Sequence, residues 1–219
     1  MPLPVILGYD SNEKPFQDWE MHRSSFDKMK KFCEELVQGR AGQRLTIMDL
    51  GSLDINGTYR PLFKREEWHY IGLDLESGPN VDVVLTDPYE WSKVASRSVD
   101  VLISGQTLEH IQHFWRTMLE VERVLKPGGL CCLIAPSSGF EHRHPVDCWR
   151  FYPDGFQALC DFIGFEPLSV YTQWEDADYP DGSDAWHDTV LIARKPKRPL
   201  IKRTKWTLAQ YLKRKALAL

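Results

Sequence analysis

The fold is decided by the stretch Leu45-Thr46-Ile47-Met48-Asp49-Leu50-Gly51-Ser52-Leu53-Asp54-Ile55-Asn56-Gly57. An apolar run ends at an acid, a small flexible loop follows, and an amphipathic stretch runs from Thr58 to Lys64. This order predicts a buried strand, a tight turn and the start of a helix. Because ligands of open parallel sheets bind beyond the carboxyl ends of the strands, we expect a cofactor at this loop.

The rest of the chain alternates between strand and helix patterns. Hydrophobic spacing predicts helices over 18–37, 114–125 and 153–163, and strands over 68–74, 81–87, 99–104, 130–135, 165–174 and 186–193. The first helix could pack on the sheet or cover a cofactor cleft. The alternation predicts an α/β fold with a mainly parallel sheet. No helix separates the last two strands, so they predict a terminal hairpin whose final strand is antiparallel.

Composition places the chain among ordinary globular proteins. Its 219 residues fit one domain with an appendage, and hydrophobic residues make up 42%. No apolar run approaches the roughly 18 residues of a membrane helix, and the opening residues do not resemble a signal peptide. Five cysteines, odd in number and without a C-x-x-C pair, predict reduced thiols and a cytoplasmic location. The sequence does not indicate an oligomeric state.

Charge is divided unevenly along the chain. Residues 194–219 hold ten basic residues and no acid, so the remainder, with 17 basic and 31 acidic residues, carries a formal charge of −14. In the tail, Leu208, Tyr211, Leu212, Ala216 and Leu219 share one helical face. A basic amphipathic helix suits an anionic membrane surface or a partner; a solvated tail, or one docked on the acidic body or on a second copy, stays open.

Acidic residues end three successive predicted strands. Asp49, Asp74 and Asp87 stand at these ends, and the fourth strand ends in Ser104-Gly105-Gln106. Since the carboxyl ends of parallel strands share one edge, these groups should converge. A carboxylate after the second strand commonly accepts both ribose hydroxyls of an adenine nucleoside.

Five ordered motifs over residues 45–193 resemble the class I S-adenosylmethionine-dependent methyltransferases, specifically the type 11 group. They are Ile47–Gly51, Gly72–Asp74, Leu85–Asp87, Leu102–His110 and Glu122–Gly129. The resemblance implies a Rossmann-like three-layer sandwich with a seven-stranded sheet, the last strand antiparallel, and S-adenosylmethionine as cofactor. It implies cofactor contacts from Asp49, Gly51, Ser52, Asp54, Asn56, Gly57, Asp74, Leu75, Asp87, Ser104 and Gln106.

The loop departs from the family's G-x-G-x-G pattern, since Asp54 and Asn56 stand among its glycines. Both are turn formers that can bond neighbouring amides, so a tight loop is still expected. A dinucleotide would require G-x-G-x-x-G here. The loop lacks that pattern and places Asp54 where it would repel a phosphate, whereas a cationic sulfonium suits an acidic site.

The polar and aromatic segment 141–152 follows the fifth strand, where the family's substrate loops lie. We expect His144 beside Asp147 as the general base, with His110 as a further catalytic candidate. Substrate contacts are expected from His142, Arg143, Trp149, Arg150 and His187. The two arginines suit an anionic substrate but could instead pair with the acidic loop 175–184. His142, His144 and Asp147 could ligate a metal, but without a second cluster we expect none.

These features predict a cytoplasmic methyltransferase acting on a small polar acceptor, with a hydroxyl of a sugar or glycan precursor favoured. The expected units are an N-terminal helical cap over 1–43, the methyltransferase domain over 44–193 and a basic tail over 194–219. An acidic body without a basic stripe argues against nucleic acid as a partner. The alternative is a methyltransferase-like scaffold without catalysis that uses its tail and acidic face for assembly.

Overall fold

A computed structural model describes residues 22–175 and 178–217. The expectations for residues 18–21 of the first helix and for Leu219 of the tail fall outside these ranges. The longer helices are α1 (Arg23–Phe32), α2 (Phe114–Val124), α3 (Pro153–Ile163) and α4 (Leu200–Ala216). The strands are β1 (Leu45–Leu50), β2 (Trp68–Asp74), β3 (Val83–Val84), β4 (Val99–Gly105), β5 (Leu125–Ala135), β6 (Glu166–Thr172) and β7 (Thr189–Arg194).

All seven strands form one sheet in the order β3-β2-β1-β4-β5-β7-β6. Strands β1 to β5 pair in parallel, and β7 runs antiparallel to both of its neighbours. The predicted Rossmann-like sheet with an antiparallel final strand is therefore confirmed. Because β1 lies at the point where the strand order reverses, its carboxyl end faces the crevice in which such sheets bind ligands.

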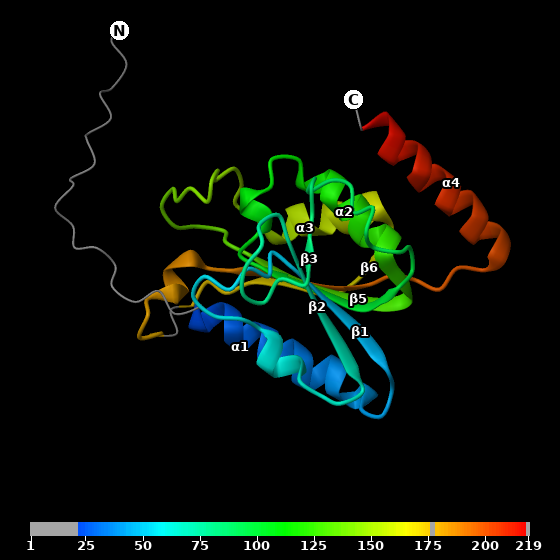
Figure 1. Ribbon diagram of the computed structural model, residues 1–219. Helices are drawn as coiled ribbons and strands as arrows, with labels where there is room; N and C mark the ends of the chain where they lie inside the picture. The colour runs from blue at the N-terminus through cyan, green and yellow to red at the C-terminus, as the bar shows by residue number, and fades with distance from the viewer. Residues whose placement is uncertain (1–21, 176–177, 218–219) are drawn as a thin grey trace, which may run out of the picture.

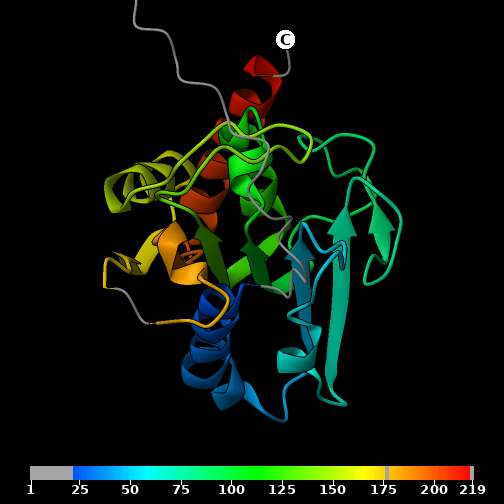
Figure 2. The same ribbon diagram turned by 90° about the vertical axis from the view of Figure 1, so that its left-hand side faces the viewer.

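Helices cover both faces of the sheet, which gives three layers (Figures 1 and 2). On one face, α1 buries Met29 and Phe32 against alternate side chains of β1 and β4, such as Ile47 and Val101. On the other face, α2 and α3 bury Met118 and Phe156. Successive side chains of β1 and β4 point alternately into the cores on the two faces of the sheet. Both faces are buried, so the sequence of each strand is apolar almost throughout.

Two elements near the glycine loop, residues 51–57, are shorter than predicted. The stretch from Thr58 to Lys64 forms only the 3-10 turn η3 (Arg60–Phe63), with Pro61 in its first turn. The strand expected over 81–87 is reduced to β3, since the side chain of Asp82 accepts the Gly72 amide at 2.7 Å in place of a backbone carbonyl. Both differences place polar side chains beside the cofactor edge.

Three other boundaries also differ from the prediction. Helix α1 continues into a π-helical turn, η1 (Cys33–Val37), followed by a 3-10 turn, η2 (Gln38–Arg40). Strand β5 begins at Leu125, and the expected turn over 126–129 forms a bulge inside it, with Gly128 at a φ of 86°. Helix α4 begins at Leu200 rather than near Thr207. Tertiary pairing extends these elements beyond the local pattern.

Helix α4 packs on α2 and α3 through its basic and polar side. The Trp206 indole donates to Glu122 at 3.2 Å, and Lys213 donates to the Phe162 carbonyl at 2.8 Å. Leu208, Tyr211 and Leu212 face outward, each about half exposed. The tail thus contacts α2 and α3 through hydrogen bonds from its polar and basic side chains. Across the described residues, no helix is long and apolar enough to span a membrane.

Candidate active site

The glycine loop turns sharply at the carboxyl end of β1. Gly51 has a φ of 76°, and a Cβ added to it would lie 2.1 Å from Oγ1 of Thr107. Its amide donates to the Leu73 carbonyl at 2.9 Å, which joins the turn to the end of β2. Only glycine accommodates both this backbone conformation and this approach. The loop is therefore fixed against the carboxyl ends of β2 and β4.

Asp74, the expected ribose acceptor, organises the floor of this site. Its Oδ2 accepts the Leu53 amide at 2.9 Å, and its Oδ1 accepts the amides of Leu75 and Glu76 at 2.7 and 3.2 Å. Each carboxylate oxygen has two lone pairs, so Oδ2 retains capacity for a ligand hydroxyl. Leu75 itself is 48% exposed beside it.

The middle of the glycine loop is closed by Asp54. Its Oδ1 accepts the Gly57 amide at 2.8 Å, which is the local bond expected of a turn former. Its own amide donates to the Pro79 carbonyl at 3.1 Å. No hydrogen bond of the Asn56 side chain is found within the described part of the chain. A tight loop thus forms without the G-x-G-x-G pattern.

Asp49 lies beneath the loop, within β1 rather than beyond its end. It is 3% exposed, and the Tyr70 hydroxyl donates a very short hydrogen bond to its Oδ2. Burial raises the pKa of this carboxyl to about 7, although the Tyr70 bond opposes the shift. Its Oδ1 and the hydroxyl of Ser52 are buried without a hydrogen-bond partner in the described structure. These two polar atoms mark where a ligand group could bind.

The remaining expected cofactor residues contact other parts of the chain. Ser104 is 1% exposed and donates to the Leu50 carbonyl at 2.8 Å, so it braces β4 against β1. The Gln106 amide donates to Asp188 at 2.8 Å. Asp87 accepts the Tyr89 amide at 2.7 Å. These hydrogen bonds fix the three residues within the protein at the carboxyl edge of the sheet.

Two residues that belong to none of the sequence motifs, Arg60 and Asn80, hold the segments around the glycine loop together. The Arg60 guanidinium donates to Asp82 at 2.6 Å and lies 4.5 Å from the centre of the Tyr70 ring. The Asn80 amide donates to the Ser52 carbonyl at 2.8 Å. No local pattern could have identified them, because the contacts join segments on either side of β2.

Asp188, also missed, connects α1 to the site. It is 1% exposed and accepts from Lys28 at 3.3 Å and from Ser24 at 3.0 Å, as well as from Gln106. Helix α1 therefore packs on the sheet, one of the two alternatives raised for it, and its Ser24 and Lys28 contact Asp188. A signal was present, since Asp188 is an acid inside the apolar strand predicted over 186–193.

The segment 141–152, here called the acceptor segment, is tied to the turn after β4. That turn is η4 (Leu108–His110). The Cys148 amide donates to the Glu109 carbonyl at 2.8 Å, and the His110 ring bonds the Val146 carbonyl through Nδ1 at 2.6 Å. The Trp149 indole donates to the Ile111 carbonyl at 3.2 Å. These bonds bring His110 and the acceptor segment together.

The expected pairing of His144 with Asp147 is not the one observed. Arg150 binds both oxygens of Asp147, at 2.6 and 2.9 Å, and holds the pKa of that carboxyl down at about 2. Asp147 also accepts the His142 amide at 2.8 Å. His144 is exposed, with its ring centre 6.0 Å from that of His110. The i to i+3 spacing of Asp147 and Arg150 explains the exchange of partners.

The other substrate candidates are dispersed. Arg143 pairs with Glu141 at 2.7 Å on the surface, so neither arginine of the segment is seen to pair with the acidic loop. The His187 ring bonds the Gln173 carbonyl at 3.2 Å and packs near Trp174. Trp149 packs edge-on against Phe114, on the wall of a cavity of about 440 Å³.

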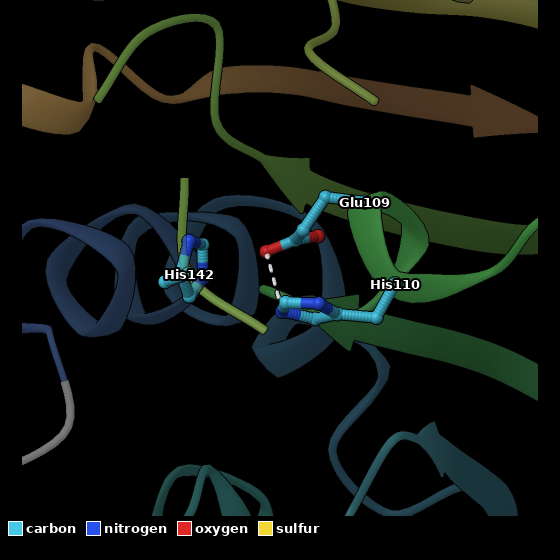
Figure 3. Close-up of side chains that lie close together, drawn as sticks. All are labelled: Glu109, His110 and His142. Carbon is cyan, nitrogen blue, oxygen red and sulfur yellow. Dashed lines mark ion pairs between the residues drawn. The ribbon is translucent and has the colours of Figure 1, made fainter. Parts of the chain in front are cut away.

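Glu109 is the most unusual side chain of the site. It is fully buried, and neither carboxyl oxygen has a hydrogen-bond partner among the described residues. Burial raises its pKa to about 8. Figure 3 shows its carboxyl group directed toward His110 and His142, whose pKa values burial lowers. Glu109 belongs to the motif Leu102–His110, but its place next to His110 in the sequence does not predict that its side chain is buried.

Comparison with known proteins supports the assignment of this domain. Residues 48–133 match the family model described as "Methyltransferase domain". This segment is similar to the methyltransferase domains that the family model describes. An uncharacterized methyltransferase of Mycolicibacterium gilvum is 27% identical over 121 residues, which are 47% of this chain and 46% of the relative. The match thus spans about half the length of this curated relative.

Solved structures share the fold at low sequence identity. A methyltransferase from Methanosarcina mazei has a TM-score of 0.58 at 15% identity, covering 75% of this chain and 98% of its own. The 1,6-didemethyltoxoflavin-N1-methyltransferase of Burkholderia thailandensis, solved with S-adenosylhomocysteine, has a TM-score of 0.58 at 16% identity, covering 80% and 85%. These similarities confirm the Rossmann-like fold predicted from the sequence.

Proposed function

We propose that the chain binds S-adenosylmethionine and transfers its methyl group to a small polar acceptor, with a sugar or glycan-precursor hydroxyl favoured. The observation that carries this proposal is the closed loop at the end of β1, which Gly51, Asp54 and Asp74 hold at the reversal of strand order. The family match over this region supports it.

The groups at this edge fit the proposed cofactor. Asp74 would accept the ribose hydroxyls, because one carboxylate can bind two neighbouring donors. The unpartnered Oδ1 of Asp49 and hydroxyl of Ser52 offer acceptors for an ammonium or amide donor. Asp54, with Asp49 and Asp74, makes the site acidic, which suits a cationic sulfonium and disfavours the pyrophosphate of a dinucleotide.

When bound, S-adenosylmethionine supplies a methyl group activated by a positively charged sulfur. The chain then needs mainly to hold the acceptor in line with that methyl group and to exclude water. The acceptor segment and η4 border the site on this side and offer His110, His142 and His144 as candidates to move a proton. A hydroxyl needs such a group more than an amine does, which favours an oxygen acceptor.

The structural relatives do not restrict the acceptor. One is an N-methyltransferase, another is described as the CurJ carbon methyltransferase, and a third is the [4+2]-cyclase SpnF. The polar character of the acceptor segment, with its histidines and Arg150, is what supports a polar acceptor in this chain. We also retain a cytoplasmic location, supported by five cysteines without a C-x-x-C pair.

Calorimetry with S-adenosylmethionine and S-adenosylhomocysteine tests the proposal. The wild-type chain should bind both, and Asp74→Ala should lower affinity at least about 100-fold, since it removes the carboxylate expected to accept from the ribose. Glu76→Gln is the matched control, because Glu76 is an exposed neighbouring acid whose side chain is not assigned to the ligand. Failure of the wild type to bind either compound would refute the proposal and favour the non-catalytic scaffold.

The tail supplies the second feature that a scaffold would use. Helix α4 presents Leu208, Tyr211 and Leu212 outward while its basic side contacts the body. Peripheral contact with a membrane or a partner through this face stays a proposal. It is compatible with methyl transfer, because α4 packs on α2 and α3 rather than at the carboxyl edge.

A further inference from the structure

Three side chains with metal-binding atoms converge beside the glycine loop. Glu109, His110 and His142 each place one nitrogen or oxygen within 4.8 Å of the others (Figure 3). The first two come from η4, and His142 comes from the acceptor segment after β5. We call these three residues the Glu109 cluster. Their side chains are 0%, 14% and 18% exposed, so the cluster is largely shielded from water.

The polar groups of this cluster are not satisfied by one another. Both oxygens of Glu109 and Nδ1 of His142 are buried without a hydrogen bond to any described residue. The distance from Glu109 Oε1 to His110 Nε2 is 3.8 Å, which is too long for a hydrogen bond. A buried carboxyl group left in this state is unfavourable unless a ligand binds it.

The charged neighbours do not neutralise Glu109 directly. Arg150 binds both oxygens of Asp147 and also donates to the Phe140 and Trp149 carbonyls. Asp188 is engaged by Lys28, Ser24 and Gln106. Apart from the two histidines, no basic side chain among the described residues is seen to pair with Glu109.

The surrounding bonds orient the His110 ring as metal ligands are usually oriented. His110 Nδ1 lies 2.6 Å from the Val146 carbonyl, so that nitrogen carries the proton and Nε2 keeps its lone pair. Histidine ligands commonly donate their other N–H to a carbonyl or carboxylate in this way. His142 Nδ1 lies 3.3 Å from Asp147 but makes no hydrogen bond to any described residue.

We propose that Glu109, His110 and His142 form a binding site for one divalent transition-metal ion. Two imidazoles and a carboxylate suit zinc, manganese, iron(II) or cobalt(II) better than magnesium or calcium, which prefer oxygen ligands. Three protein ligands leave coordination positions open, as in catalytic rather than structural sites. This set differs from the His142, His144 and Asp147 set considered from the sequence, and it departs from the expectation of no metal.

The position of the site gives the ion a role, which rests on the proposed function. Glu109 follows Thr107, which contacts the glycine loop at Gly51. An ion there would bind an acceptor hydroxyl and lower its pKa. The hydroxyl proton would pass to solvent, the oxygen would form a bond to the methyl carbon, the carbon–sulfur bond would break, and the sulfonium would leave as a neutral thioether.

Cobalt(II) binding to the full chain, after removal of metals with a chelator, tests the site. Absorption in the visible range and calorimetry should report one ion per chain, and zinc should displace it. Glu109→Gln and His142→Gln should each weaken binding at least about 100-fold, because loss of a direct ligand should exceed the 10 to 100-fold effect of an outer partner. His113→Gln is the matched control, since His113 lies outside the cluster near Tyr89.

Binding of S-adenosylmethionine, measured on the same metal-free variants, separates misfolding from loss of a ligand. Both variants should keep wild-type affinity for it. Wild-type protein that binds neither cobalt nor zinc would overturn the proposal, as would variants that bind them as the wild type does. Metal binding without cofactor binding would refute the proposed function and leave the metal site standing. Cofactor binding without metal binding would do the reverse.

Discussion

The glycine loop and the Glu109 cluster lie at the same edge of the sheet, yet their carboxyl groups differ in hydrogen bonding. In the loop, Asp54 and Asp74 accept backbone amides at 2.7 to 3.2 Å. In the cluster, Glu109 is more deeply buried and accepts nothing from the described residues. The chain alone therefore determines the shape of the loop, whereas the cluster requires something from outside the chain.

Asp49 is intermediate between the two. One of its oxygens accepts from Tyr70, and the other is buried without a partner in the described structure. We therefore expect the effect of a substitution on stability to depend on how fully the side chain is hydrogen-bonded within the chain. Substitutions in the loop should destabilise the folded chain, and substitution of Glu109 should not, because Glu109 contributes to ligand binding rather than to folding.

The largest effect is expected at Gly51. Gly51→Ala forces a Cβ against the Thr107 side chain in a left-handed backbone conformation. Overpacking and the unfavourable φ together should lower the free energy of unfolding by about 2 to 5 kcal/mol. S-adenosylmethionine binding should be lost as well. Chemical denaturation and calorimetry measure the two effects.

Gly155→Ala is the matched control for this change. Gly155 lies in α3, and a Cβ there would meet nothing within 4 Å. Alanine should stabilise this helix by about 0.5 to 1 kcal/mol. Equal effects of the two substitutions would show that the glycine loop is not fixed against β4 as described.

Strong periodicity made the framework predictable from the sequence. Apolar runs and helical stripes identified β1, β2, β4, α2 and α3, and the terminal hairpin followed from two strands without a helix between them. The helix expected after β1 is only the 3-10 turn η3, because a seven-residue amphipathic pattern is too short to stabilise an α-helix by itself. Short patterns are overridden by backbone chemistry and by tertiary contacts.

The candidate site was predictable only where single residue types determine the geometry. Gly51, Asp54 and Asp74 could be identified because a turn and a strand end restrict what can stand there. The partner of Asp147 could not, because the conformation of the acceptor segment depends on distant bonds such as that from Cys148 to Glu109. The same long-range contacts bury Glu109, which no local pattern reveals.

The pH dependence of stability tests whether Asp49, which has one bonded oxygen and one without a partner among the described residues, is protonated in the folded chain. Burial raises its pKa from 3.8 to about 7. Between these values the folded chain binds a proton that the unfolded chain has lost, so this group's contribution to stability falls as pH rises from about 4 to 7. Asp49→Asn keeps an acceptor for Tyr70 but cannot titrate.

The difference in unfolding free energy between wild type and Asp49→Asn should therefore shift against the wild type by about 3 kcal/mol across this window. Denaturation of both proteins at pH 4.5, 6 and 7.5 measures it, and other titrating groups cancel in the difference. Parallel pH profiles would mean that Asp49 is paired well enough to remain ionised throughout.

The smallest effect, and the one of opposite sign, is expected at Glu109. Glu109→Met replaces a buried, unpartnered carboxyl group with an apolar side chain of similar length. Removing an unsatisfied polar group should raise the free energy of unfolding by about 1 kcal/mol in metal-free protein. Glu141→Met, at an exposed position of the acceptor segment, should change it by less than about 0.5 kcal/mol.

Added cobalt or zinc should reverse the order of stability. The ion stabilises only a folded chain that binds it, so the wild type should gain stability and Glu109→Met should not. If Glu109→Met is strongly destabilised even without metal, the carboxyl group has a partner within the chain, and the contrast with the glycine loop fails. A gain in stability that disappears on metal addition would identify Glu109 as a residue maintained for its ligand at the expense of the fold.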